Sequence, residues 1–173
     1  MARARSMAAG ILAFISELVS SIEADGMTDP RAKFIRIQSR RYLAAYGRSH
    51  FETAAVYGRR LAEGFCWYAL PPGHPARYEG LCAMSWALDF WDMYVSDFVR
   101  DHTDIGRIAS HLGMGLTTWR IFDDVTIMRR YGNMGAHFDE YALHADPEAF
   151  TATLRIIVAS IVLFRHLPPV SNL

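Results

Sequence analysis

Apolar residues recur at intervals of three and four along most of the chain, and this spacing restricts the fold more than any other feature of the sequence. Within residues 8–24, for example, the apolar positions are Ile11, Leu12, Ile15, Leu18, Val19 and Ile22. Such spacing places the apolar side chains on one face of an α-helix. No run of β-branched residues alternates with polar ones, as a half-buried strand would require. We therefore expect an all-α protein, a helical bundle of five to six helices without a sheet.

Residues that start and stop helices divide the chain into segments. The long helices are expected at residues 8–24, 30–46, 49–70, 79–99, 116–130 and 147–166, with a short one at 104–112. Two starts are well marked, because Asp29-Pro30 and Asp146-Pro147 each combine an N-cap residue with a proline in the first turn. Gly132 and Asn133 are poor residues for a helix interior, so the helix at 116–130 is expected to end before them.

The length and charge of the chain limit the functions that are open to it. A chain of 173 residues is expected to form a single domain. Its 18 Lys and Arg residues balance 18 Asp and Glu residues, which argues against tight, non-specific coating of DNA. Lys33 is the only lysine, and arginine is the residue best suited to phosphates and to interface ion pairs. No stretch is apolar enough to span a membrane, so we expect a cytoplasmic protein.

Residues 128–137, which read MRRYGNMGAH, form the most informative motif of the sequence. A second stretch, YGRRLAE at residues 57–63, lies on an expected helix upstream. The first motif resembles the pattern hydrophobic-Arg-x-x-Gly-Asn-x-small-small-His. This pattern marks a HEPN-like domain of unknown function that is also found at the N-terminus of type I restriction enzyme motor subunits. By this resemblance the domain consists of N-terminal helices, residues 1–46, and a HEPN-like core, residues 47–167.

The resemblance implies a helical bundle that commonly forms homodimers. Active HEPN members are metal-independent ribonucleases. Each copy contributes an arginine and a histidine separated by four to six residues, and two copies together form one composite site. By this resemblance the catalytic histidine is His137. The catalytic arginine is either Arg130, which has six residues between it and His137, or Arg129, which aligns with the arginine of the Gly-Asn pattern. Tyr131 departs from the polar residue that often follows the arginine in the nucleases. No cofactor and no metal ion are expected.

These residue types suit the cleavage of RNA without a metal ion. The 2′-hydroxyl of RNA can attack the adjacent phosphate, and a histidine can take or give the proton near neutral pH. An arginine offers a planar fork of donors to the charge that develops on the phosphate oxygens. Asn133 would orient the phosphate or the imidazole. The arginines expected to contact RNA are Arg59 and Arg60, together with Arg36 and Arg40 of a basic stripe that also holds Lys33 and Arg41.

Each of these residues also has a structural interpretation. His137 would then be a histidine hydrogen-bonded to the backbone, and Arg129 and Arg130 would be cations at a helix C-terminus, where they suit the helix dipole. Gly132-Asn133 would be a helix stop, and Glu63 the partner of an arginine. Asp123-Asp124 would be a solvated face, or one of the two would touch an arginine of the motif. The aromatic residues at 86–98, with Trp119 and Tyr131, are either core or a dimer seam.

Two classes of function remain open at this point. The first is a small HEPN ribonuclease, a toxin or defence effector that a protein partner such as an antitoxin keeps silent. The second is a non-catalytic helical module that dimerises or docks on a larger nucleic-acid-processing complex. An open cleft that contains His137 and a motif arginine would favour the enzyme, and an enclosed histidine would favour the module.

Overall fold

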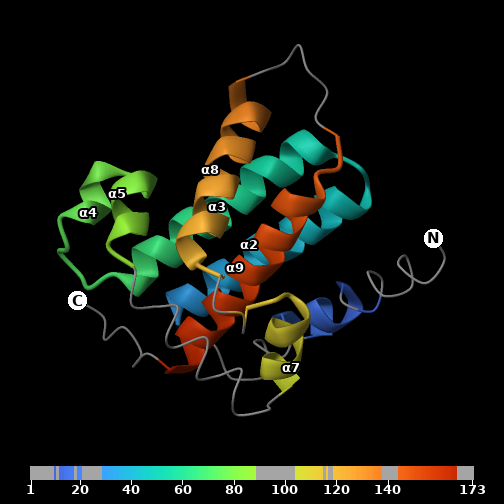
Figure 1. Ribbon diagram of the computed structural model, residues 1–173, viewed down its shortest axis with the longest axis horizontal. Coiled ribbons are helices and arrows are strands. Elements are labelled where there is room, and N and C mark those ends of the chain that lie inside the picture. Colours follow the sequence, from blue (N-terminus) through green and yellow to red (C-terminus); the bar gives the residue numbers. More distant parts are fainter. Residues whose placement is uncertain are drawn as a thin grey trace.

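The computed structural model describes residues 10, 12–17, 19–20, 29–88, 104–114, 116, 119–137 and 144–166, although the side chains of 104, 137 and 164–166 lie outside the description. These residues form helices and turns without a strand, so the all-α prediction is confirmed. The helices with defined bounds are α2 (Pro30–Gly47), α3 (Phe51–Ala69), α4 (Ala76–Glu79), α5 (Leu81–Trp86), α7 (Asp104–His111), α8 (Ile121–His137) and α9 (Pro147–His166) (Figure 1). The described ranges thus contain seven helices with defined bounds, more than the expected five to six.

Helix α9 forms the centre of the packing. Every residue from 156 to 163 is buried, so this stretch is enclosed by protein on all sides. Helices α2, α3, α7 and α8 each contact it. Its start was predicted correctly: Oδ1 of Asp146 accepts hydrogen bonds from the backbone N–H groups of Glu148 (2.9 Å) and Ala149 (3.2 Å). The start of α2 is confirmed in the same way, because Asp29 accepts from the N–H of Arg31 at 2.8 Å.

Helices α3 and α8 cross closely, and α4 and α5 form a corner at the C-terminal end of α3 (Figure 1). Two glycines allow the approach. A Cβ atom on Gly58 of α3 would lie 2.3 Å from Cε of Met128, and a Cβ atom on Gly132 of α8 would lie 2.4 Å from Cβ of Arg59. Both distances are shorter than van der Waals contact. At Gly58 the flexible end of Met128 could move aside, but at Gly132 the clash is with an atom next to the backbone, so the helices can pack at this separation only because Gly132 has no side chain.

Two expected helix boundaries are wrong. The helix expected at 116–130 is α8, which starts at Ile121 and continues through Gly132-Asn133 to His137, because the close packing against Arg59 offsets the poor helix propensity of glycine. The helix expected at 79–99 is interrupted at Gly80, whose φ of +95° favours glycine. Helix α5 then ends at Trp86, and residues 89–103 lie outside the described residues. Among the described helices, none combines the length and the apolar character that crossing a membrane requires.

Candidate functional site on helices α3 and α8

Helix α8 carries the whole motif at 128–137 as one continuous helix, and this decides how its residues are arranged. Arg130, Asn133 and His137 follow one another at intervals of three and four residues, so their Cα atoms lie along one face of the helix. Arg129 lies one turn before Asn133 on the neighbouring edge of that face. Arg130 and Asn133 are exposed and Arg129 is half-buried. The backbone of His137 ends the helix, and its side chain lies outside the described residues.

Arg59 of α3 connects the two sequence motifs. Its Nε donates to Oε1 of Glu63 at 2.9 Å, one helical turn further along α3. One of its terminal nitrogens, Nη1, donates to Oδ1 of Asn133 on α8. The aliphatic part of Arg59 lies against Gly132, where a Cβ would be 2.8 Å from Cδ of the arginine. Glu63 is therefore the partner of an arginine, as expected, and the side chain of Asn133 is held by a group from another helix.

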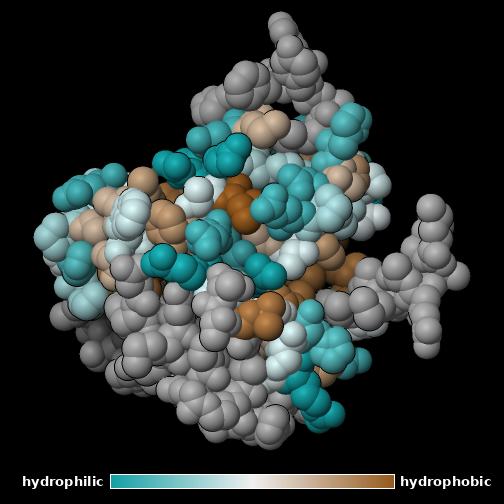
Figure 2. Space-filling view, in the orientation of Figure 1, coloured by the Kyte–Doolittle hydropathy of each residue, from teal (hydrophilic) through white to brown (hydrophobic). Residues whose placement is uncertain are grey.

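The remaining predicted arginines lie on α2 and α3. Arg60 is exposed, and its guanidinium lies 5.9 Å from the ring centroid of Tyr57. Arg41 of α2 approaches the same ring at 5.8 Å, so Tyr57 links the basic stripe to α3. Arg40 is also exposed, and its Nη2 lies 3.5 Å from Oγ of Ser20. Arg36 is half-buried. Figure 2 shows that hydrophilic side chains gather on the face where α8 crosses α3.

A groove of about 370 Å³ opens beside Glu63, between α2, α3 and α5. Its walls include Phe34, Trp67, Leu81 and Met84, and Arg60 and Glu63 supply its charged groups. The groove was not predicted from the sequence. The sequence did indicate one wall of the groove, because Arg60, Glu63 and Trp67 are spaced at three and four residues and so share a face of α3. The residues from α2 and α5 have no such signal, because only the tertiary structure brings them to α3.

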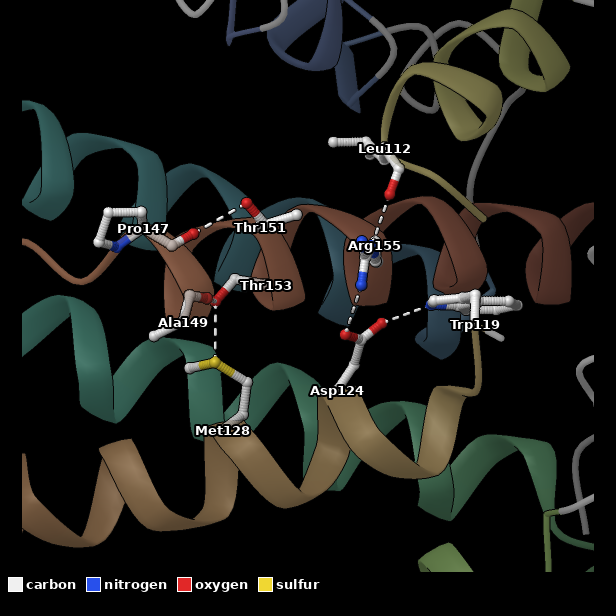
Figure 3. Close-up of polar contacts among 9 residues, drawn as sticks. All are labelled: Leu112, Trp119, Asp124, Met128, Pro147, Ala149, Thr151, Thr153 and Arg155. Carbon is white, nitrogen blue, oxygen red and sulfur yellow. Dashed lines mark hydrogen bonds and ion pairs between the residues drawn. The ribbon is translucent and has the colours of Figure 1, made fainter. Parts of the chain in front are cut away.

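A buried polar cluster was also missed. Asp124 of α8 is 1% exposed, so the expectation that Asp123-Asp124 forms a solvated face is wrong for Asp124. Figure 3 shows its carboxylate between two donors: Nε1 of Trp119 donates to Oδ2 at 2.8 Å, and Nη1 of Arg155 donates to Oδ1 at 3.3 Å. Nε of Arg155 also donates to the carbonyl oxygen of Leu112 at 2.6 Å. The arginine that pairs with Asp124 thus comes from α9 and not from the motif at 128–137.

Burial dominates the electrostatics of this cluster. It raises the pKa of Asp124 to about 7, although the hydrogen bond from Trp119 and the charge of Arg155 act in the opposite direction. The contacts of the cluster are all internal, and they join α8, α9 and the segment after α7. We therefore assign it to stability and not to chemistry.

Two of the aromatic residues considered for a dimer seam are buried inside the chain. Trp119 is held by Asp124, and Tyr131 donates from its hydroxyl to the carbonyl oxygen of His144 at 3.0 Å. Burial raises the pKa of Tyr131 to about 12. Of the two interpretations, core or dimer seam, these two residues therefore fit the core. Trp86 differs, because it is 62% exposed and packs against Phe122 of α8 with ring centroids 4.5 Å apart. Residues 90–98 of the aromatic set lie outside the described residues.

No group of three or more His, Cys, Asp or Glu residues in the described part of the chain could hold a metal ion. The comparisons with known proteins add no relative: no family model, no curated protein and no solved structure matches this chain.

Proposed function

We propose that this chain is a HEPN-like, metal-independent endoribonuclease of a toxin or defence system, and that it acts as a homodimer. His137 transfers the proton, Arg130 and Arg129 bind the phosphate, and Asn133 orients it. One observation supports this proposal most: Arg130, Asn133 and His137 share one face of a continuous helix. The backbones of Arg130 and His137 are about 10 Å apart along the helix axis, at a rise of about 1.5 Å per residue.

The proposed reaction is a transesterification within the RNA. The 2′-oxygen attacks the adjacent phosphorus and loses its proton to a base, while the bond from phosphorus to the 5′-oxygen breaks and that oxygen takes up a proton. The products are a 2′,3′-cyclic phosphate and a free 5′-hydroxyl. His137 serves as the proton-transfer group at one of these oxygens, and the arginines stabilise the charge on the phosphate. Arg59 limits the motion of Asn133 through the hydrogen bond between them.

The test is cleavage of end-labelled single-stranded RNA in the presence of EDTA. The wild-type protein should cut the RNA and leave cyclic phosphate ends, and an otherwise identical DNA should stay intact. His137→Ala and the double variant Arg129→Ala/Arg130→Ala should each lower the rate by about a hundredfold or more, the typical contribution of a general acid–base group. Arg48→Ala is the matched control, because Arg48 is an exposed arginine at the end of α2 that is not among the proposed site residues.

Two results would contradict the ribonuclease. If the cleavage persisted in the variants, it would come from another site or another protein. If several RNAs remained uncut by the folded wild-type protein, the alternative would gain: a non-catalytic module that dimerises or docks on a larger nucleic-acid-processing or defence complex. The exposed rings of Trp86 and Tyr78, 62% and 75% accessible, favour such docking. A mass twice that of the 19.6 kDa chain, measured by light scattering, would then identify the dimer.

A further inference from the structure

The groove beside Glu63 has aromatic walls. Trp67 is 38% exposed, and its ring contacts the guanidinium of Arg77 at 4.9 Å and the ring of Tyr78 at 6.2 Å. Phe34 packs directly on Gly64, where a Cβ would lie 2.0 Å from Cε1 of the phenylalanine. Rings held in this way lose little conformational freedom when a ligand binds, so they favour binding of a flat, apolar surface.

The charged end of the groove points to the kind of ligand. Oε1 of Glu63 accepts from Arg59, and a carboxylate has further lone pairs on both of its oxygens to offer to a ligand. Arg60 lines the same groove and provides a cation for a phosphate. A flat ring for stacking, an acceptor for N–H groups and a cation for phosphate together match a nucleotide of a single strand. The volume of about 370 Å³ is within the usual range of small-molecule pockets, roughly 300–1,000 Å³.

The carboxylate also selects among the four bases. Guanine presents two adjacent donors, N1–H and the N2 amino group, which match the two oxygens of a carboxylate. Adenine and cytosine present one amino group beside a ring nitrogen whose lone pair repels a carboxylate. Uracil presents a single N–H between two carbonyl oxygens. A carboxylate held by another residue, as Glu63 is held by Arg59, therefore discriminates in favour of guanine.

We propose that this groove binds a guanine base of single-stranded RNA, with the base stacked on Trp67 and its Watson–Crick edge on Glu63. Arg60 binds a phosphate next to that base. This inference rests on the proposed function in taking RNA as the substrate, and it assigns to that ribonuclease a preference for guanine beside the cut. Glu63, Arg59 and Asn133 form a continuous chain of hydrogen bonds, so the base site adjoins the proposed catalytic face of α8.

The experiment measures binding without cleavage. Fluorescein-labelled 2′-O-methyl pentanucleotides UUGUU, UUAUU, UUCUU and UUUUU lack the free 2′-hydroxyl that the cleavage requires, and their binding is followed by fluorescence polarisation. UUGUU should bind about tenfold more tightly than the other three, since a good bidentate contact discriminates by about 1–3 kcal/mol. Glu63→Gln should reduce this preference to within about threefold, because an amide supplies only one acceptor. Trp67→Ala should weaken the binding of UUGUU by about tenfold.

The controls are Glu79→Gln and Trp86→Ala, which change an exposed carboxylate and an exposed tryptophan outside the groove. Both should retain the wild-type preference, and circular dichroism should show all variants to be folded. Equal affinity for the four pentanucleotides, or a guanine preference that survives Glu63→Gln, would overturn the inference. Binding of guanine without cleavage of any RNA would overturn only the proposed ribonuclease. Cleavage that is independent of guanine would overturn only the preference for guanine beside the cut.

Discussion

At the scale of single residues, two glycines lie where α3 and α8 meet, and Gly132 limits how closely the helices can approach. Gly58 faces the methyl group of Met128, and Gly132 faces the side chain of Arg59. The second contact also has a functional consequence, because it brings Arg59 within hydrogen-bonding distance of Asn133. A side chain at position 132 would therefore disturb both the packing of the helices and the proposed site.

We predict that Gly132→Ala destabilises the protein, although alanine is the better helix former by about 1 kcal/mol. The new Cβ would lie 2.4 Å from Cβ of Arg59, an atom close to the backbone, so the two helices must move apart. Such overpacking typically costs about 1–3 kcal/mol. The free energy of unfolding is measured with urea at neutral pH.

Gly47→Ala is the matched control, since a Cβ there meets no atom within 4 Å, and it should leave the stability unchanged or raise it. A Gly132→Ala protein as stable as the wild type would show that the crossing of α3 and α8 tolerates a wider separation.

At the scale of helices, the cluster around Asp124 joins parts that are distant in sequence. Asp124 comes from α8 and Arg155 from α9, and the carbonyl group of Leu112 follows α7. Removing one partner of a buried ion pair leaves the charge of the other partner buried and uncompensated, which destabilises the fold. The cluster therefore favours one arrangement of α8 on α9. Protonation of Asp124 makes the stability of this arrangement depend on pH.

We predict that Asp124 makes the stability depend on pH between about 4 and 7. In the unfolded chain an aspartic acid titrates near pH 3.9, whereas burial raises the pKa of Asp124 in the folded protein to about 7. In this window the folded state holds a proton that the unfolded state has released, so raising the pH lowers the free energy of unfolding. At pH 7 about half of the folded molecules are still protonated at Asp124, and the contribution becomes constant about one pH unit higher.

Asp124→Asn isolates this effect, because asparagine keeps an acceptor for Trp119 and does not titrate. Urea unfolding of both proteins is measured at each pH from 4 to 8. The wild type should lose stability relative to the variant as the pH rises through 7, and the difference should level off near pH 8. Parallel profiles for the two proteins would show that Asp124 stays ionised in the folded state throughout.

At the scale of the whole molecule, a neutral chain distributes its charges unevenly. Exposed arginines lie on α2, α3 and α8, although the formal net charge is zero. Some of this charge is compensated locally, as in the pair of Arg59 and Glu63. Binding of RNA by such a surface should depend on a few phosphate contacts and not on the total charge.

We predict that Arg60→Ala weakens the dependence of RNA binding on salt. Each phosphate contact to a single strand contributes about −0.7 to the slope of log K against log salt concentration. Loss of Arg60 should therefore make the slope for the UUGUU pentanucleotide less negative by about that amount. The slope is obtained by fluorescence polarisation between 50 and 300 mM salt, about the range in which such contacts respond.

Arg48→Ala again serves as the control for the loss of one exposed arginine, and it should retain the wild-type slope. A slope that Arg60→Ala leaves unaltered would exclude a phosphate contact by Arg60, whatever its effect on affinity.

The sequence by itself determined the helical class of the fold and the starts of α2 and α9. Apolar spacing and capping residues act within one or two turns, so they can be read without knowledge of the partner helices. The pairing of Glu63 with an arginine was predictable for the same reason, because Arg59 lies one turn before it on α3. The candidate residues on α8 came from a resemblance, which supplied their identity without their arrangement.

Only the tertiary structure decided that α8 continues through Gly132, that Asp124 is buried, and that Arg59 holds Asn133. The same is true of the groove, whose walls come from three helices. Each of these features depends on contacts between residues far apart in the chain. Packing energies at such contacts exceed local helix propensities, which differ by only about 1 kcal/mol per residue, and so they override what neighbouring residues indicate.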